Sequence, residues 1–386
     1  MKLKTKLTKL GRNFRKNKGF VNPGIYKGST IIFENYRQYL NDRDSLDGSH
    51  SLYYGIHNNP LCNKFEKTIS SLYESADTVT VSSGLTAVII PLLTFLKPGD
   101  HILVTDSLYN PTRIFCNNIL NQYGIKVEYF HPNIRINKLE SLIKKNTKII
   151  FLESPGTATF DIMDIPNIAK IAKKNNVITI ADNTWASVIF SNPLKLGVNI
   201  VVEAITKYIS GHSDILLGII VSDKKHAKSI RNHTKNMGIC VGSEEVYLSL
   251  RGIPTLELRM KQIEKNNLLL AKELEKNNKV KKVFHPGLRS HYNYNIWKRD
   301  FNGSAGLFSI ELKKMHSNKK IENFYNKLKI FKLGYSFGGF ESLITFPNLK
   351  NRTKKYNING NLIRIYCGLE DYEDQKNDMI NALKEL

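Results

Sequence analysis

The sequence has few cysteines and no long apolar run, and each absence excludes a class of protein. Its four cysteines lie far apart and form no CxxC pair, which argues against a zinc site and a disulfide framework; they are Cys62, Cys116, Cys240 and Cys367. No apolar segment approaches the about 20 residues that cross a bilayer, and the N-terminus lacks the apolar core of a secretory signal. We therefore expect a cytoplasmic protein with no metal ion and no membrane partner.

Acidic residues are scarce beside basic ones, with 34 Asp and Glu against 57 Lys and Arg and a formal net charge of +23. Such an excess can indicate a nucleic-acid or lipid partner. Here the basic residues are scattered among Asn and Ile, as in "NLLLAKELEKNNKVKKVF", so a general compositional bias explains the charge and we expect no nucleic-acid partner. The first residues, "MKLKTKLTKLGRNFRKNKGF", are basic and contain no acidic residue, which is also typical of an organellar transit peptide. We interpret them as a solvated N-terminal arm.

The chain has 386 residues, 41% of them hydrophobic, which is enough for a large core and more than one domain. From about residue 78 to 222, apolar β-branched runs such as "HILVTDS", "TKIIFLES" and "VITIADN" alternate with helical segments such as "IPNIAKIAKKNN". Strands without polar alternation are typical of a parallel sheet covered by helices on both faces. These runs predict a doubly wound α/β domain.

After residue 243 the pattern changes to one long helical stretch, 243–276, followed by short strands such as "GLFSIEL" and "LIRIYCGL". This predicts a smaller C-terminal α/β domain joined through the long helix. We divide the chain into an irregular N-terminal arm (1–50), a large ligand-binding domain (51–243) and a C-terminal domain (244–386).

In open α/β sheets, ligands bind beyond the carboxyl ends of the strands. Polar residues follow the predicted strands at five places, which we expect to converge on one cleft: Ser82 to Leu85, Asp106 to Tyr109, Glu153 to Thr157, Asp182 to Trp185, and Thr206 with Lys207.

At three of these places the residues suit a chemical role, but an ordinary structural role explains their presence as well. Ser83 and Gly84 end a strand and begin a helix whose free N–H groups would suit a phosphate, although Ser83 is equally an ordinary N-cap. Asp182 ends a buried strand, where a carboxylate needs a cation or hydrogen-bond donors, which a capped turn would also supply. Burial of Lys207 would lower its pKa and leave a nucleophilic amine, although a lysine after a strand is usually solvated.

Taken together, these residue types indicate one particular cofactor. A phosphate site at a helix start, an acid for a pyridinium nitrogen, an amine for an aldehyde and an aromatic ring at Tyr109 are what pyridoxal phosphate requires.

The sequence also resembles the Cys/Met-metabolism family of pyridoxal-phosphate enzymes along nearly its whole length. The matching stretches are "LYYGIHNNP", "SSGLTAV", "DSLYNPT", "FLESPGT", "IADNTWAS", "ITKYISGHSD", "SLRGIPTLELR", "WKRDFNGSAGLFS", "GYSFGGFESL" and "LIRIYCGLED". The likeness is greatest to bacterial members that cleave L-cystathionine by β-elimination. It implies the PLP-dependent transferase-like fold (fold type I), with a large domain built on a mostly parallel sheet and a smaller C-terminal α/β domain. It also implies a homo-oligomer, a dimer or tetramer, with shared active sites.

By this resemblance Lys207 is the Schiff-base lysine, Tyr109 stacks on the cofactor ring and Asp182 pairs with its nitrogen. The phosphate would be held by residues of three segments, of which the first comes from a neighbouring subunit: Tyr54; Ser83, Gly84 and Leu85; and Thr206. Arg364 would bind the substrate carboxylate, beside a segment formed by Tyr335, Ser336 and Phe337. Either Lys207 or Tyr109 would protonate the leaving group.

The chain departs from the family pattern at three positions. Ile56, followed by His57, replaces an arginine that would contact the phosphate; Phe337 replaces a tryptophan of the β-eliminating members; and Ala204 replaces a frequent serine. We expect Glu341 to be structural and His212 to be a turn residue. Two alternative activities stay open for this chain. It could carry out γ-elimination or γ-replacement, as other members of the family do, or it could cleave cysteine or cysteine S-conjugates by β-elimination.

Overall fold

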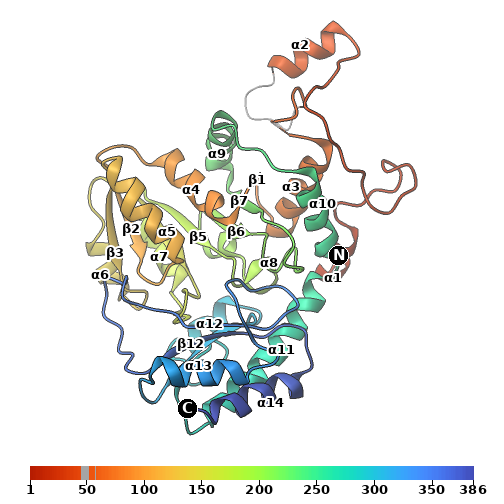
Figure 1. Ribbon diagram of the computed structural model, residues 1–386. Coiled ribbons are helices and arrows are strands. Elements are labelled where there is room, and N and C mark those ends of the chain that lie inside the picture. The colour runs from red at the N-terminus through yellow and green to blue at the C-terminus, as the bar shows by residue number, and fades with distance from the viewer. Residues whose placement is uncertain (45–51, 57) are drawn as a thin grey trace.

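A computed structural model describes residues 1–44, 52–56 and 58–386. A large sheet is followed in the chain by a smaller one, which confirms the predicted α/β architecture (Figure 1). The strands of the large sheet lie in the order β1 (Asp77–Val81), β7 (Gly218–Ser222), β6 (Ile200–Ala204), β5 (Ile178–Asp182), β4 (Thr147–Glu153), β2 (His101–Thr105) and β3 (Lys126–Phe130). Strands β6, β5, β4, β2 and β3 are parallel to one another.

Strand β7 is the exception, because it runs antiparallel to both β1 and β6. The large sheet is therefore mostly rather than wholly parallel, as expected. A parallel neighbour needs a crossover connection, usually a helix, and residues 205–217 contain turns but no helix. The chain therefore reverses directly after β6, and this reversal contains Lys207.

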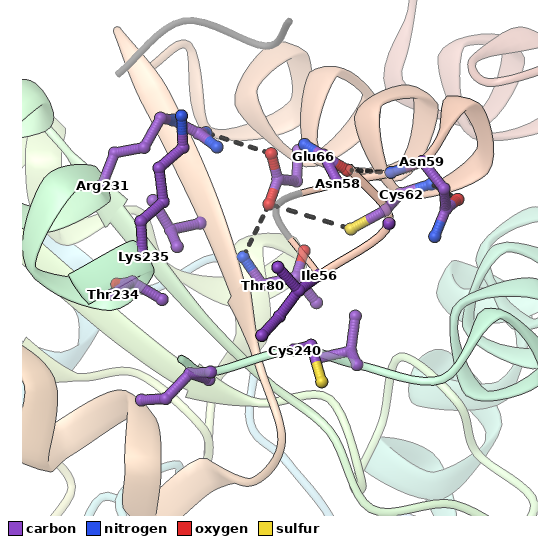
Figure 2. Close-up of a pocket in the computed structure, with 14 residues that line it drawn as sticks. Ile56, Asn58, Asn59, Cys62, Glu66, Thr80, Arg231, Thr234, Lys235 and Cys240 are labelled. Atoms are coloured by element: carbon purple, nitrogen blue, oxygen red, sulfur yellow. Dashed lines mark hydrogen bonds and ion pairs between the residues drawn. The ribbon is translucent and has the colours of Figure 1, made fainter. Parts of the chain in front are cut away.

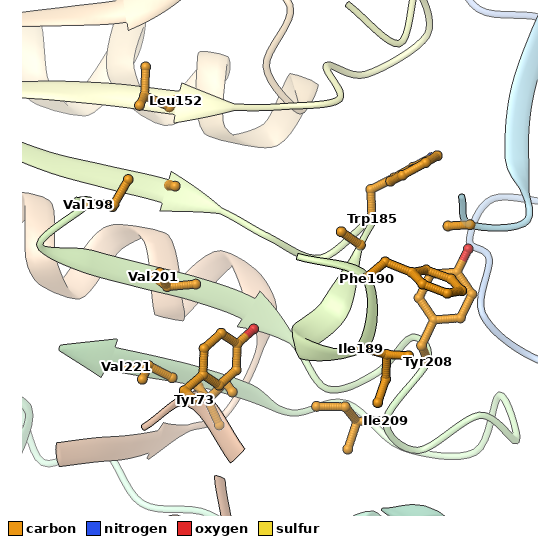
Figure 3. Packing of buried hydrophobic residues seen from close by; sticks show 14 of the residues in the cluster. Tyr73, Leu152, Trp185, Ile189, Phe190, Val198, Val201, Tyr208, Ile209 and Val221 are labelled. Atoms are coloured by element: carbon orange, nitrogen blue, oxygen red, sulfur yellow. The ribbon is translucent and has the colours of Figure 1, made fainter. Parts of the chain in front are cut away.

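Both faces of the large sheet are buried, as its uninterrupted apolar strands predict. Alternate residues of β4 enter opposite clusters: Ile150 and Leu152 face one, Ile149 and Phe151 the other. The first cluster includes α3 (Pro60–Tyr73), α7 (Ile165–Lys174) and α8 (Ser187–Phe190), and Figure 3 shows part of it. The second includes α4 (Gly84–Phe95), α5 (Asn110–Phe115) with the π-helical turn Cys116–Leu120, and α9 (Lys224–Asn236).

The smaller sheet has five strands in the order β10 (Lys332–Leu333), β11 (Leu343–Thr345), β12 (Leu362–Tyr366), β9 (Leu307–Leu312) and β8 (Val280–Phe284). Its core includes side chains of α11 (Leu256–Glu275), α13 (Asn318–Lys327) and α14 (Tyr372–Leu383). The single helix expected over 243–276 is instead divided into α10 (Ser243–Gly252), a 3₁₀ turn (Ile253–Thr255) and α11. Pro254 lies in the break, where its missing N–H and its ring disfavour a continuous helix.

The N-terminal arm is less irregular than expected, because it contains α1 (Leu3–Lys9) and α2 (Tyr36–Asp44). Leu7 is buried in the core beneath the large sheet, and Arg12 donates to the carbonyl of Leu250 in α10 at 3.0 Å. The remaining short elements are α6 (Ile136–Ser141), the 3₁₀ turn Pro193–Leu196 and α12 (Tyr294–Asp300). The last residues of the predicted arm, 45–50, lie outside the described residues, and the domain boundaries stay predictions.

Within the described residues, none of the helices has the length and apolar character needed to cross a membrane.

Candidate active site

The carboxyl ends of β4, β5 and β6 meet the start of α4, as the polar residues after these strands predict. Asp182 and Glu153 are paired neighbours at the ends of β5 and β4. The amide of Ala204, at the end of β6, donates to the hydroxyl of Thr184 at 2.9 Å. A Cβ on Gly84 would lie 2.5 Å from the Cβ of Ala204, so the start of α4 lies directly against the end of β6. The four segments thus share one site.

The start of α4 has two of the properties that a phosphate site requires. Ser83 caps the helix, accepting the Thr86 amide at 3.1 Å, while the first amides of a helix have no intrahelical acceptor and attract anions. Gly84 is required there by space, because any side chain would collide with Ala204. The nearby hydroxyl of Thr206 accepts the Leu217 amide at 3.0 Å and donates to its carbonyl at 3.2 Å, so an anion would compete for that proton.

Lys207 lies on the β6–β7 reversal and is partly buried. Its Nζ is 2.7 Å from the Ser336 hydroxyl and 5.1 Å from the centre of the Phe337 ring. Burial, assisted by the positive charge of Arg364 and opposed by Asp182, lowers the pKa of Lys207 to about 8. A substantial fraction of this amine is therefore neutral, and so nucleophilic, near physiological pH.

Asp182 has donors of its own, since the amide and hydroxyl of Thr184 donate to Oδ1 at 2.9 and 2.6 Å. Even so, burial raises the pKa of Asp182 above its ordinary value. No ion pair to Asp182 is found among the described side chains. A cationic ring nitrogen placed against this carboxylate would favour its ionised form.

Glu153 is a site residue that the sequence analysis did not assign, although it begins one of the five polar segments. One carboxylate oxygen accepts the backbone amide of Tyr109 at 2.6 Å, and the other accepts the Thr157 hydroxyl at 2.6 Å. Burial, and then the neighbouring Asp182, raises the pKa of Glu153 to about 8. Its contact fixes the backbone of Tyr109, whose side chain is 47% exposed.

Arg364 extends into the site from the smaller domain. It lies in the middle of β12 and makes one long hydrogen bond, from Nη2 to the Ser336 carbonyl at 3.4 Å. None of the carboxylates in the described part of the chain pairs with it. Burial lowers the pKa of Arg364, and Tyr109 and Tyr335 oppose this shift. Because none of the described carboxylates pairs with it, its guanidinium can bind an incoming carboxylate.

The segment 335–339 lies over Lys207. Ser336 has φ of 119°, which is rare for a residue with a side chain and is typical of functional sites. A Cβ on Gly338 would lie 2.6 Å from the Lys207 carbonyl carbon, so only glycine fits there. Phe337 packs against Tyr208, with ring centres 5.6 Å apart, whereas Tyr335 is 92% exposed and lies outside this packing.

Arg259, in α11, is a second contributor that the sequence analysis did not single out. Its guanidinium donates to the carbonyls of Tyr208 and Ile209 at 2.6 and 3.3 Å. The Tyr208 hydroxyl in turn accepts the Gly306 amide at 3.0 Å. The backbone directly after Lys207 is therefore held by the smaller domain.

Tyr54 and Ile56 are not brought to this cluster. Tyr54 is 47% exposed and forms an isolated bridge with Thr30, and Ile56 lines a separate pocket with Cys62, Glu66, Arg231 and Cys240 (Figure 2). The contact of Tyr54 with a neighbouring subunit's cofactor stays a prediction, and His57 lies outside the described residues.

The two residues expected to be structural have local partners. A ring nitrogen of His212 lies 2.6 Å from the Ser210 carbonyl, within its own turn, and Glu341 accepts the Ser213 hydroxyl at 2.5 Å.

Comparison with known proteins identifies related chains. A family model described as Cys/Met metabolism PLP-dependent enzyme matches residues 4–384. A putative cystathionine beta-lyase of Rhizobium johnstonii is 40% identical over 98% of this chain and 94% of its own. An L-alanine/L-glutamate racemase of Wolbachia pipientis wMel is 36% identical over 100% and 98%, and an L-methionine gamma-lyase of Fusobacterium nucleatum is 34% identical over 94% and 93%. The crystal structure of metB from Corynebacterium glutamicum has a TM-score of 0.90 at 27% identity, covering 100% and 98% of the two chains.

Proposed function

This chain belongs to the family of Cys/Met metabolism PLP-dependent enzymes, and we propose that it cleaves L-cystathionine by β-elimination to homocysteine, pyruvate and ammonia. Its fold is the fold type I of PLP-dependent enzymes and its cofactor is pyridoxal phosphate. At the coarser level it is a lyase of cysteine and methionine metabolism.

The residues present fit this cofactor. The first turn of α4 offers unpaired amides and a glycine for the phosphate. Asp182 offers the ring nitrogen a partly buried carboxylate that forms no ion pair with the described side chains, and Lys207 offers the aldehyde an amine of lowered pKa. When bound, pyridoxal phosphate supplies an electron sink that makes the substrate Cα–H bond acidic.

The chain's own residues would perform the remaining steps. Arg364 would bind the substrate α-carboxylate through its planar pair of donors. The amine of Lys207 would take the proton from Cα, with Ser336 orienting it through the 2.7 Å contact. Lys207 or Tyr109 would then donate a proton to the sulfur that leaves Cβ.

The observation that carries this proposal is the partly buried amine of Lys207, which lies 2.7 Å from the Ser336 hydroxyl and whose pKa is lowered by burial and by Arg364. The cystathionine preference is supported by the stretch "ESPGT", which resembles that of the β-eliminating members, and by the relative from Rhizobium. A γ-acting enzyme must remove a proton from Cβ as well, and would yield 2-oxobutyrate and cysteine from the same substrate. Assaying both keto acids after incubation with L-cystathionine tests the choice: pyruvate supports β-elimination, and 2-oxobutyrate without pyruvate refutes it.

A second candidate activity, amino-acid racemisation, is favoured by the racemase relative, which matches the whole chain. Racemisation begins with the same removal of the Cα proton by Lys207, and differs in returning a proton to the opposite face. Chiral chromatography after incubation with L-alanine or L-glutamate tests it. The D-enantiomer, formed by the wild type and not by Lys207→Ala, would establish this activity, and its absence would exclude it.

We also propose that the enzyme acts on amino acids as a homo-oligomer, in which Tyr54 of one subunit reaches the phosphate of another. This accounts for an exposed tyrosine that has no contact with the cluster of its own chain. Mixing inactive Tyr54→Ala with inactive Lys207→Ala should restore about a quarter of the activity, because random dimers then contain one intact site in half of the molecules. No recovery after subunit exchange would contradict a shared site.

A further inference from the structure

A segment of the smaller domain, residues 352–354 between β11 and β12, contacts both loops that hold Tyr109 in place. Its first contact is with Asp106, which follows β2 and is fully buried. The amide and hydroxyl of Thr353 each donate to Asp106 Oδ1 at 3.0 Å, and the amide of Lys354 donates to Oδ2 at 2.8 Å. Asp106 lies three residues before Tyr109, so these bonds tie the start of the Tyr109 loop to the smaller domain.

Asp106 also holds the other end of that loop. Arg113, in α5, donates through Nη2 to the Asp106 carboxylate at 2.8 Å and to its carbonyl at 2.7 Å. Tyr109 lies between these two residues in the chain. A buried carboxylate is costly unless several donors satisfy it, so the donors of the 352–354 segment are part of what keeps this loop in its conformation.

Arg352 provides a second and separate route to Tyr109. Its Nη1 donates to the Thr159 hydroxyl at 2.9 Å, and its Nη2 donates to the Thr157 carbonyl. The Thr157 hydroxyl donates to Glu153, whose other oxygen accepts the Tyr109 amide. The loop after β4 is itself joined to the Tyr109 loop, since the Thr157 amide donates to the Ser107 carbonyl at 2.6 Å.

The packing of the segment is local, because the guanidinium of Arg352 lies over the ring of Tyr356, 4.2 Å from its centre. The side chains of Thr353 and Lys354 are exposed, while the polar groups of the segment converge on two loops of the large domain. The connection that contains it also leads into β12 and Arg364. We propose that the 352–354 segment is a positioning element, through which the domain that carries Arg364 fixes the backbone of Tyr109. Its catalytic meaning rests on the proposed role of Tyr109 at the cofactor.

The test compares Arg352→Ala with Lys355→Ala in the full-length enzyme loaded with pyridoxal phosphate. Lys355 is the matched control: it is exposed, lies on the same connection and carries the same charge, and it has no hydrogen bond or ion pair in the described structure. Hydrogen–deuterium exchange is followed in peptides covering 106–113 and 153–159, together with the visible circular dichroism of the bound cofactor. For Arg352→Ala we expect about tenfold faster exchange in both peptides, the factor that the loss of one charged hydrogen bond supplies, and a visible signal lowered by about half. Lys355→Ala should change neither, and Arg352→Lys should restore part of the protection.

A milder variant separates local from general effects. Thr353→Val removes one hydroxyl donor to Asp106 and should speed exchange in 106–113 by about threefold without changing 153–159. Equal exchange and an equal visible signal in Arg352→Ala and Lys355→Ala would overturn the proposal, and so would exchange in Thr353→Val that rises throughout the chain. Exchange requires no turnover, so this result is independent of whether cystathionine proves to be the substrate.

Discussion

Replacing Lys207 with methionine should make the cofactor-free protein more stable at neutral pH. Burial lowers the pKa of Lys207 from 10.5 to about 8, so below pH 8 the folded protein keeps a charge in an unfavourable place. At 1.36 kcal/mol for each factor of ten in proton affinity, this costs about 3 kcal/mol. Methionine removes that cost and loses the hydrogen bond to Ser336, worth about 1 kcal/mol, which leaves a net gain of about 2 kcal/mol.

The pH dependence identifies the cause. Between about pH 8 and 10.5 the unfolded chain binds more protons at this lysine than the folded one, so the stability of the wild type rises with pH relative to Lys207→Met. The gain should therefore shrink through this range and be gone above it. Urea unfolding of the cofactor-free proteins at pH 7 and pH 10.5, at equal protein concentration, measures it, with the exposed Lys355→Met as control. A gain that is absent at pH 7, or equal at both pH values, would refute the argument.

Three further results are expected. Arg364→Lys should raise the KM for the amino-acid substrate by about 10-fold to 100-fold while the absorption spectrum of bound cofactor stays unchanged, because ammonium replaces a two-donor guanidinium; an unchanged KM would remove Arg364 from the carboxylate site. Asp182→Asn should lower kcat by at least about 100-fold, as expected when a catalytic ionisation is lost, and wild-type turnover would contradict its pairing with the ring nitrogen. Phe308→Ala, at a fully buried position of β9, should lower the free energy of unfolding by about 3 to 5 kcal/mol, and a loss below about 1 kcal/mol in urea unfolding would show that this core is poorly packed.

Much of the large sheet could be predicted because its strands are short apolar runs with clear ends. The segments ending at Glu153 and Asp182 were both placed correctly, and the carboxyl ends of parallel strands necessarily lie at one edge. That geometry alone brought Asp182 and the turn at Gly84 towards Lys207. Strand direction was harder, because β7 depends on the absence of a helix in 205–217 rather than on its own residues.

The hydrogen bonds that hold the site residues in place could not be predicted from the sequence pattern. Asp106 and Thr353 are 247 positions apart, and nothing in either stretch indicates the other. Glu153 could be placed at a strand end, but its hydrogen bond to the Tyr109 amide depends on how two loops fold back. Arg259 contacts carbonyl oxygens, which carry no sequence signal of their own.

The central claim is that Lys207 carries out β-elimination with pyridoxal phosphate. The most direct measurement records the visible absorption of the purified holoenzyme and of Lys207→Ala before and after adding L-cystathionine, and assays pyruvate, 2-oxobutyrate and homocysteine in the same tube. We predict a lysine-dependent band that is missing in Lys207→Ala, with pyruvate and homocysteine formed in equal amounts by the wild type alone. Product formation by Lys207→Ala at the wild-type rate, or 2-oxobutyrate and cysteine in place of pyruvate and homocysteine, would contradict it.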